Sequence, residues 1–280
     1  MDVGGRGQFA HLTRRGTLRV PQITATFWVI KGLSTALGES TSDYSVHAVA
    51  PQLAVIAGFG FFVVALVWQF KAGRYDRWRY WFAVAMVGVF GTMAADVLHV
   101  ALGVPYVAST ILYALALAAV FFEWRATERT LSIHTVDSPR REAFYWATVV
   151  ATFAMGTALG DFTSITLNLG YWPSALIFGG LILIPAIGYR WLAWNPIACF
   201  WIAYVLTRPL GASIADGLGK PPRDHGLGLG AGPVAGAFAF LIVLGVAYLS
   251  VTRRDLQPEP TSTRPPGRGE LAEAAEADVA

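Results

Sequence analysis

A spacing of three residues recurs along the chain: a tryptophan, a glycine ten positions later, and an aspartate five positions after the glycine. The copies are Trp28, Gly38 and Asp43; Trp81, Gly91 and Asp96; Trp146, Gly156 and Asp161; and Trp201, Gly211 and Asp216. Four copies at long intervals indicate an internal repeat, and each interval is long enough for two membrane helices with their turns. The sequence therefore predicts four two-helix repeats.

The composition is that of a membrane protein. Apolar residue types make up 55% of the chain and charged residues only 14%, and the mean hydropathy is +0.49. These values exclude an ordinary soluble domain of this length. The net charge of +3 gives no indication of a nucleic-acid partner. Cys199 is the only cysteine, so an internal disulfide and a cysteine-based metal site are excluded. We also expect neither enzymatic activity nor a required cofactor.

The predicted fold is all-α, with eight transmembrane helices in four parallel repeats. The apolar segments lie at about 22–44, 51–70, 78–100, 105–124, 143–165, 172–190, 196–217 and 231–251. They form a membrane domain of residues 21–252, with repeats at about 22–75, 76–140, 141–192 and 193–252. Residues 1–20 and 253–280 are predicted to be disordered tails, because they are polar or rich in proline, alanine and glutamate.

The basic residues predict the orientation in the membrane. Most of the 21 Lys and Arg residues fall in the two tails and in the loops after the second, fourth and sixth segments, whereas Lys220 and Arg223 fall in a loop on the other side. Loops rich in Lys and Arg stay in the cytoplasm. We therefore expect both termini to be cytoplasmic, in a multi-pass protein of the bacterial inner membrane.

The four motif aspartates are the main candidates for a functional site. Each lies 15 residues past its tryptophan, about 22 Å along a helix. Parallel repeats would thus bring all four carboxylates to one depth in the outer half of the bilayer. Lipid cannot solvate them, so they should face the protein interior, where acidic oxygens suit a divalent cation such as Mn, Fe, Zn, Mg or Ca. The alternative is that each aspartate caps or stabilises its own helix.

Other residues extend this candidate site. Glu39 is expected to act as a further ligand or proton carrier, because it lies one helical turn before Asp43. His47 and His99 are weaker candidates for metal ligands, since both can lie at exposed helix ends. The two basic residues inside the apolar segments, Lys31 and Arg208, are predicted to pair with carboxylates and to hold an empty site closed. The alternative for Lys31 is that its side chain extends toward the lipid headgroups.

Two other sequence features carry structural expectations. Pro209 is expected to break the seventh helix beside Arg208, because proline removes a helical hydrogen bond. The motif glycines are expected to allow close helix packing or a local break, and the motif tryptophans to set packing and depth.

Four stretches resemble an uncharacterised family of bacterial membrane-anchored proteins. They are Phe-Trp-Val-Ile-Lys-Gly at 27–32, Phe-Tyr-Trp-Ala-Thr at 144–148, Met-Gly-Thr-Ala-Leu-Gly-Asp at 155–161, and Phe-Trp-Ile-Ala-Tyr-Val-Leu-Thr-Arg-Pro-Leu-Gly-Ala-Ser at 200–213. The similarity covers about residues 22–251. It implies four tandem repeats of two membrane helices, each marked by a tryptophan, together with a link to the regulation of amylopullulanase.

These observations predict a secondary transporter that exchanges a cation, in particular a divalent metal, for protons. A channel is an alternative within the same class. The alternative from another class is a sensor or regulatory scaffold that does not transport and acts through its cytoplasmic tails. The lipid bilayer, the cation and protons are the expected partners.

Overall fold

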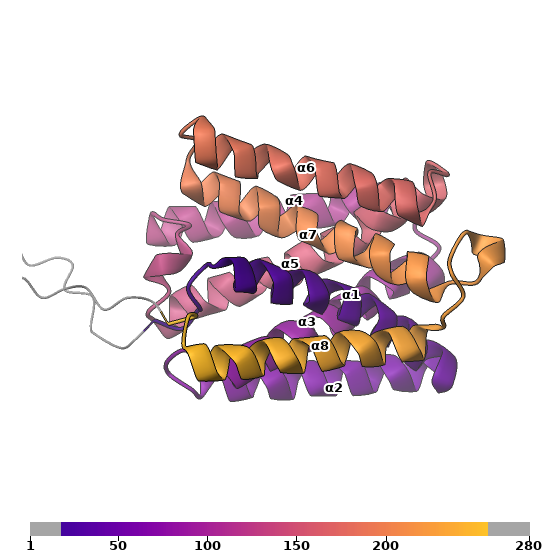
Figure 1. The fold of residues 1–280 in the computed structure, drawn as a ribbon, viewed down its shortest axis with the longest axis horizontal. Coiled ribbons are helices and arrows are strands. Elements are labelled where there is room, and N and C mark those ends of the chain that lie inside the picture. Colours follow the sequence, from indigo (N-terminus) through magenta and orange to yellow (C-terminus); the bar gives the residue numbers. More distant parts are fainter. Residues whose placement is uncertain (1–17, 257–280) are drawn as a thin grey trace, which may run out of the picture.

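Residues 18–256, the part of the chain that the computed structural model describes, form eight long helices and no strand. The helices are α1 (Ala25–Ala48), α2 (Pro51–Phe70), α3 (Arg77–Asp96), α4 (Tyr106–Glu128), α5 (Pro139–Asp161), α6 (Tyr171–Trp191), α7 (Pro196–Gly219) and α8 (Ala231–Thr252). They lie side by side along one direction (Figure 1). The all-α prediction is confirmed.

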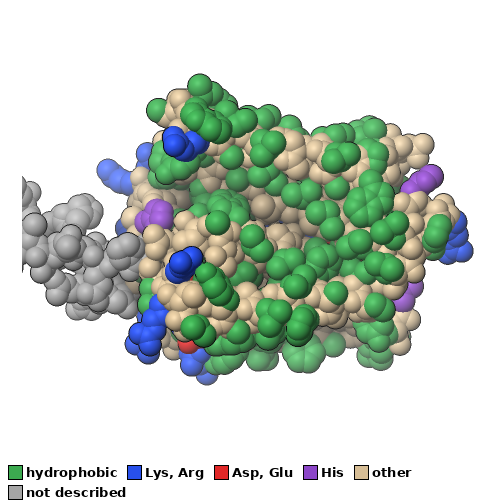
Figure 2. Space-filling view, in the orientation of Figure 1, with side chains coloured by type: hydrophobic (Ala, Val, Ile, Leu, Met, Phe, Trp, Pro, Cys, Tyr) green, Lys and Arg blue, Asp and Glu red, His purple; other side chains and the backbone are tan. Residues whose placement is uncertain are grey.

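Seven of the helices in this part of the chain, α2 to α8, are long and apolar enough to cross a membrane. Apolar side chains cover much of the surface along the helices, and several basic side chains lie at the end from which both tails leave (Figure 2). These features indicate a multi-pass membrane protein. The exception, α1, has 24 residues but carries Lys31, Glu39 and Asp43 among many hydroxyl side chains.

The odd-numbered helices form an inner ring, and the even-numbered helices cover it. In the ring, α1 packs on α3, α3 on α5, α5 on α7, and α7 on α1. Each outer helix packs mainly on the following ring helix: α2 on α3, α4 on α5, α6 on α7, and α8 on α1. In the most apolar stretch of α3, α5 and α7, 56% to 67% of the residues are buried, against 17% to 28% in the four outer helices. The interior of the molecule therefore belongs to the helices that carry the motif.

The motif glycines are the points where neighbouring ring helices touch. A Cβ atom added at Gly38, Gly91, Gly156 or Gly211 would lie 2.7 Å from Gly88, 2.9 Å from Phe153, 2.5 Å from Arg208 and 1.9 Å from Thr35, respectively. Each of these contacted residues stands three positions before the motif glycine of its own helix. The same contact thus recurs at the same offset around the ring. These distances place each motif glycine where two ring helices approach closely.

Pro209 does not break α7, which runs without interruption from Pro196 to Gly219. The prediction of a break was wrong because α5 makes room for the proline ring. Gly156 and Gly160 of α5 face it, and Cβ atoms added there would lie 3.1 Å and 3.6 Å from atoms of Pro209. A helix can accommodate an interior proline where neighbouring helices pack around it.

The ordered chain extends into both predicted tails. The Arg19 N–H donates to the Val136 carbonyl at 2.9 Å, and Val20 is buried. After α8, Asp255 is buried and accepts two hydrogen bonds from Arg77, at 3.0 and 3.1 Å. Residues 18–20 and 253–256 are therefore part of the folded structure and not of disordered tails. The rest of both predicted tails, 1–17 and 257–280, lies outside the described residues.

Candidate functional site

The motif aspartates lie at one end of the ring, which we call the acidic end. Asp96 is the last residue of α3 and Asp161 the last residue of α5, and a π-helical segment follows each of them, at Val97–Ala101 and Phe162–Thr166. Asp43 and Asp216 lie in the final turns of α1 and α7, which remain α-helical to their ends. The backbone is therefore π-helical after two of the motif aspartates and α-helical after the other two.

Three carboxyl groups converge at the acidic end. Oxygen atoms of Glu39, Asp43 and Asp216 all lie within 4.8 Å of one another, and we call these residues the carboxylate triad. Asp96 and Asp161 are not part of the triad. They remain within electrostatic range of it, since Asp96 interacts with Glu39 and Asp43, and Asp161 with Glu39 and Asp216. The predicted meeting of four aspartates is thus corrected to two aspartates and Glu39, which come from the adjacent helices α1 and α7.

Lys220 lies against the carboxylate triad, although its position just after α7 suggested an outer loop. Its ammonium group forms an ion pair with Asp43 and lies 3.7 Å from an Asp216 oxygen. Burial lowers the pKa of Lys220, but the charges of Asp216 and Asp43 outweigh burial and hold the pKa above its usual range. Lys220 is therefore positively charged at neutral pH. The four-residue spacing from Asp216 is the sequence signal for this contact.

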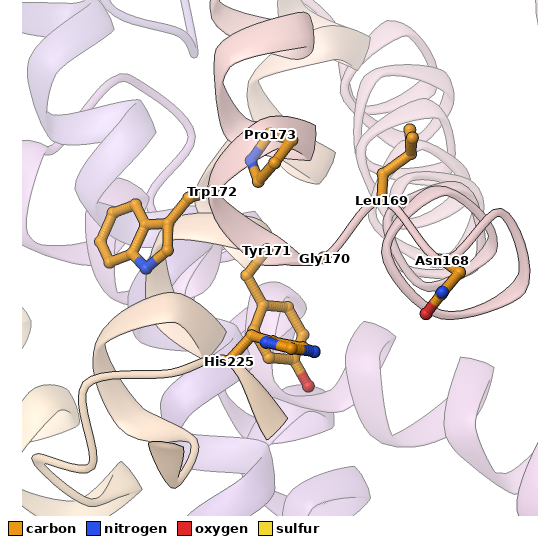
Figure 3. A pocket seen from close by; sticks show the side chains of 7 residues that line it. All are labelled: Asn168, Leu169, Gly170, Tyr171, Trp172, Pro173 and His225. Carbon is orange, nitrogen blue, oxygen red and sulfur yellow. The ribbon is translucent and has the colours of Figure 1, made fainter. Parts of the chain in front are cut away.

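A surface pocket of about 390 Å³ lies at the same end of the molecule. It is formed where the connection between α5 and α6 meets the connection between α7 and α8, and Asn168, Tyr171, Trp172, Pro173 and His225 line it (Figure 3). The Tyr171 and His225 side chains lie next to each other in this view. The Tyr171 hydroxyl interacts electrostatically with Asp216 and Lys220, so the pocket adjoins the charged groups of the acidic end.

Arg208 lies in the centre of the ring, about two helical turns before Asp216 on α7. Its Nη2 atom donates to Glu39 Oε2 at 2.7 Å, to Thr157 Oγ1 at 2.7 Å, and to the hydroxyl of Thr92. Its Nη1 atom donates to the Thr35 carbonyl at 3.2 Å. Glu39, Thr92 and Thr157 each directly follow a motif glycine, so one guanidinium joins equivalent positions of three helices. The predicted pairing of Arg208 with a carboxylate is present, whereas the two threonines were not predicted.

Lys31 lies further from the acidic end and has no ion pair or hydrogen bond from its ammonium group within residues 18–256. The Nζ atom stands 4.2 Å from the centre of the Phe153 ring and 4.4 Å from that of Tyr204. The predicted ion pair between Lys31 and a carboxylate is therefore absent among these residues. The reason is its position: it stands two helical turns before Glu39 on α1, and aromatic rings of α5 and α7 surround its side chain.

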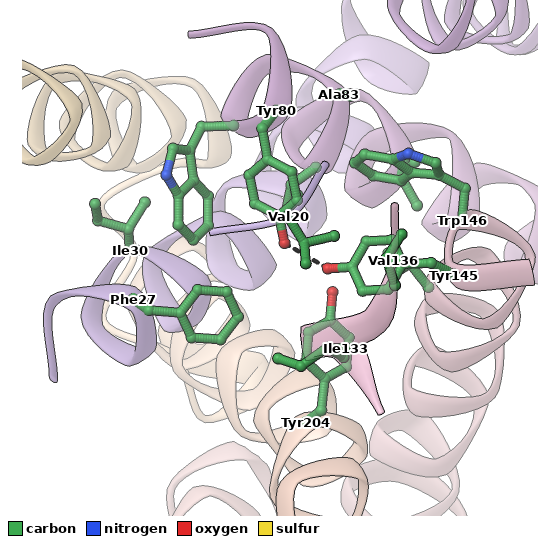
Figure 4. Packing of buried hydrophobic residues seen from close by; sticks show 14 of the residues in the cluster. Val20, Phe27, Ile30, Tyr80, Ala83, Ile133, Val136, Tyr145, Trp146 and Tyr204 are labelled. Carbon is green, nitrogen blue, oxygen red and sulfur yellow. Dashed lines mark hydrogen bonds between the residues drawn. The ribbon is translucent and has the colours of Figure 1, made fainter. Parts of the chain in front are cut away.

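Aromatic side chains fill the opposite end of the ring (Figure 4). Trp81, Trp146 and Trp201 are buried there, while Trp28 is half-buried. The hydroxyl groups of Tyr80 and Tyr145 share a hydrogen bond, and Val20 packs into the same cluster. Large aromatic side chains thus occupy the end of the ring that lies opposite the acidic residues.

The two histidines that were candidate metal ligands, His47 and His99, are not part of the carboxylate triad. His47 is exposed, and its Nδ1 atom lies 2.6 Å from the backbone carbonyl of Asp43. His99 Nδ1 lies 2.7 Å from the Val104 carbonyl, and its ring stacks on Tyr106. Both imidazoles therefore bond to the ends of their own helices, and neither joins the group of carboxylates that could hold a metal ion.

Comparison with known proteins identifies the repeat. A family model described as a Repeat of Unknown Function (DUF347) matches residues 79–130, 144–193 and 199–255, which together are more than half of the chain. The chain belongs to this family. The prediction of a family of tandem repeats of unknown function is thereby confirmed. No curated protein and no solved structure matches the chain.

The three DUF347 matches contain the motif copies of α3, α5 and α7. The copy in α1 has the same spacing but lies before the first match. It supplies two of the three triad carboxylates, Glu39 and Asp43, and it has charged residues, Glu39 and Lys31, at two positions where the other copies have none. The candidate site thus combines Asp216, which lies in a DUF347 repeat, with residues of α1, which lies before the first matched range.

The chemistry available at the acidic end is cation and proton binding. Among residues 18–256, Arg208 and Lys220 are the cations that interact with the five carboxyl groups of Glu39, Asp43, Asp96, Asp161 and Asp216. Carboxylates that are crowded in this way bind a cation or take up protons, because mutual repulsion opposes full ionisation. Carboxylate oxygens are also the ligands that hard cations prefer.

Proposed function

We propose that this protein is a membrane transporter that exchanges a small cation for protons, with the carboxylate triad of Glu39, Asp43 and Asp216 as its cation site. The observation that carries the proposal is the convergence of three carboxylates within 4.8 Å inside a protein of membrane helices. Asp96 and Asp161 supply further negative charge around the triad. When the cation leaves, protons on these carboxyl groups would replace its charge.

We further propose that α1 is an eighth span and that the chain holds four parallel repeats, with both termini in the cytoplasm of a bacterial cell. Support for α1 comes from its place in the ring and from its 24 residues, which suffice to cross the hydrocarbon core. Support for parallel repeats comes from the equal offset of the four glycine contacts. Support for the orientation comes from the basic residues at the end where the tails leave, opposite the acidic end (Figures 1 and 2).

Arg208 would act as the barrier in this conformation. It crosses the centre of the ring, so a cation that moved inward from the triad would meet a like charge. Binding of a proton or a cation at Glu39 would weaken the ion pair with Arg208, and Arg208 could then move. In this proposal, Arg208 couples occupation of the site to opening of the ring.

The test is cation flux in proteoliposomes. Asp43→Asn and Asp216→Asn are expected to reduce flux about tenfold or more, because a lost carboxylate ligand worth 1.4 kcal/mol already changes binding by that factor. Asp224→Asn is the matched control: Asp224 lies in the same end of the molecule but is exposed and is not part of the triad. Unchanged flux in both triad variants, with normal insertion into the membrane, would exclude the proposed site.

A second candidate function is a membrane sensor that binds the cation without transport. The filled interior of the ring favours a sensor, because Arg208, Lys31 and the aromatic cluster all lie between the triad and the opposite end of the helices. A sensor would bind the cation in detergent, lose binding in the Asp43→Asn variant, and show no flux in proteoliposomes. A transporter would show both binding and flux, and the two assays together separate the candidates.

A further inference from the structure

We propose that residues 18–23, which we call the strap, form a gate at the end of the ring opposite the acidic end. The strap opens and closes this end while the long helices stay folded, and the ion pair between Arg19 and Glu142 is its latch. The gate is independent of the proposed function, because it lies at the other end of the molecule from the carboxylate triad and its opening does not depend on what the triad binds.

The strap lies across the end of the ring and precedes α1 without regular secondary structure. Three backbone hydrogen bonds attach it to three separate segments, which are the α2–α3 connection, the α4–α5 connection and the residues after α8. The bonds run from the Tyr75 N–H to the Leu18 carbonyl at 2.8 Å, from the Arg19 N–H to the Val136 carbonyl at 2.9 Å, and from the Gln22 N–H to the Asp255 carbonyl at 2.9 Å. Because the three segments are far apart in the chain, the strap spans the end of the ring instead of following a single helix.

Val20 of the strap packs where the four ring helices meet. It is 3% exposed and belongs to a buried aromatic cluster to which each ring helix contributes. The contributions include Phe27 of α1, Tyr80 of α3, Tyr145 of α5 and Tyr204 of α7 (Figure 4). When the strap leaves, the cluster loses the Val20 side chain, and water gains access to the point where the helices meet.

The latch joins the strap to a carboxylate that the ring holds in place. The Glu142 side chain of α5 is 1% exposed, and Arg19 Nη1 donates to its Oε2 atom. Its Oε1 atom accepts from Gln69 Nε2 at 3.0 Å and from Trp146 Nε1 at 3.4 Å. Gln69 and Trp146 belong to α2 and α5, so Glu142 keeps these two hydrogen bonds when Arg19 departs. Arg19 is therefore the movable partner, and Glu142 is a fixed acceptor to which it returns.

The closed latch leaves polar atoms without partners, which favours opening. Within residues 18–256, Arg19 Nε and Gln69 Oε1 are buried and have no hydrogen-bond partner. A buried polar atom without a partner costs free energy that contact with water recovers. Opening of the strap gives both atoms access to water and so offsets part of the loss of the ion pair. The strap is thus held less firmly than the ring helices, whose backbone hydrogen bonds are made within each helix.

The test measures how often the strap opens, by the rate at which the Val20→Cys variant of the full-length protein reacts with N-ethylmaleimide at position 20. Cys199, which is buried on α7 and does not belong to the aromatic cluster, is the internal reference for unfolding of the helices. We expect position 20 to react about tenfold or more faster than Cys199, because local opening needs less free energy than unfolding. Equal rates at the two positions would overturn the proposal, since the strap would then leave only when the whole protein unfolds.

Arg19→Gln in the Val20→Cys background tests the latch. We expect it to raise the rate at position 20 about tenfold or more, the usual contribution of a hydrogen bond between charged groups, and to leave the rate at Cys199 unchanged. Arg140→Gln is the matched control, because the ion pair of Arg140 with Glu128 lies at the same end of the molecule and includes no strap residue. An unchanged rate at position 20 in Arg19→Gln, or an equal rise at both cysteines, would contradict the latch.

Ala83→Cys, in a protein that keeps Val20, shows whether the end of the ring opens with the strap. Ala83 of α3 is fully buried in the aromatic cluster. We expect Arg19→Gln to accelerate the reaction at position 83 by about the same factor as at position 20. A faster reaction at position 20 with no change at position 83 would mean that the strap leaves while the ring stays closed, and the strap would not be a gate.

Discussion

Replacement of Arg208 by methionine is expected to lower the free energy of unfolding by about 3 to 5 kcal/mol, the usual cost of removing one partner of a buried ion pair. Glu39 is 4% exposed and would lose its ion pair while Asp43 and Asp216 remain close to it. The hydroxyl groups of Thr92 and Thr157 would lose their donor as well. Denaturant unfolding of the purified protein in detergent measures the change.

The matched control is the double variant Arg208→Met with Glu39→Leu. Removal of both charges leaves no unpaired ion, and replacement of a buried pair by apolar residues is often neutral or stabilising. We therefore expect the double variant to be more stable than Arg208→Met alone, and measurement of Glu39→Leu alone completes the cycle that gives the coupling between the two residues. Equal stability of the two variants would mean that Glu39 does not depend on Arg208 for its charge compensation.

The repeat made most of the architecture predictable. Helices that carry the same residue at the same interval must present it in the same way, so the ring of α1, α3, α5 and α7 follows from the motif once the helices pack together. The motif glycines mark the contact points because no other residue allows the backbones to approach so closely. Local patterns of this kind survive in the sequence, and the all-α fold could therefore be predicted, whereas the ends of α1, α3, α4 and α5 lie up to four residues from the predicted ones.

The candidate site was less predictable because it depends on positions where the copies differ. The residue after the motif glycine is Glu39, Thr92, Thr157 or Ala212, and the residue three positions before it is Thr35, Gly88, Phe153 or Arg208. These differences give the ring one acidic side and one central cation. A search for identical residues draws attention to four equal aspartates, whereas the carboxylate triad contains only two of them.

Lys31 and Lys220 show a second limit. Both lie within a few helical turns of the same carboxylates in sequence, yet only Lys220 reaches them. The outcome depends on side-chain direction, which in a helix follows from the packing of neighbours that are distant in sequence. Phe153 and Tyr204, which hold the Lys31 ammonium group, come from two other helices. Tertiary contacts of this kind leave no local pattern.

Substitution of Gly38 by alanine is expected to destabilise the protein by about 3 kcal/mol, at the upper end of the range for overpacked cores. The added Cβ atom would lie 2.7 Å from the Gly88 carbonyl carbon and 2.9 Å from its Cα. These are backbone atoms of α3, so no side chain can rotate away and the two helices must separate. That separation would also displace Glu39, the next residue in the chain, from Arg208.

Gly32→Ala in the same helix provides the matched control, because a Cβ atom there meets nothing within 4 Å. It should stabilise α1 by about 0.5 to 1 kcal/mol, the ordinary gain of alanine over glycine inside a helix. Both variants add one methyl group to one helix, so helix propensity changes equally and only the contact with α3 differs. A Gly38→Ala variant as stable as Gly32→Ala would mean that α1 and α3 do not pack at this point, and the ring contacts at the other motif glycines would then need the same test.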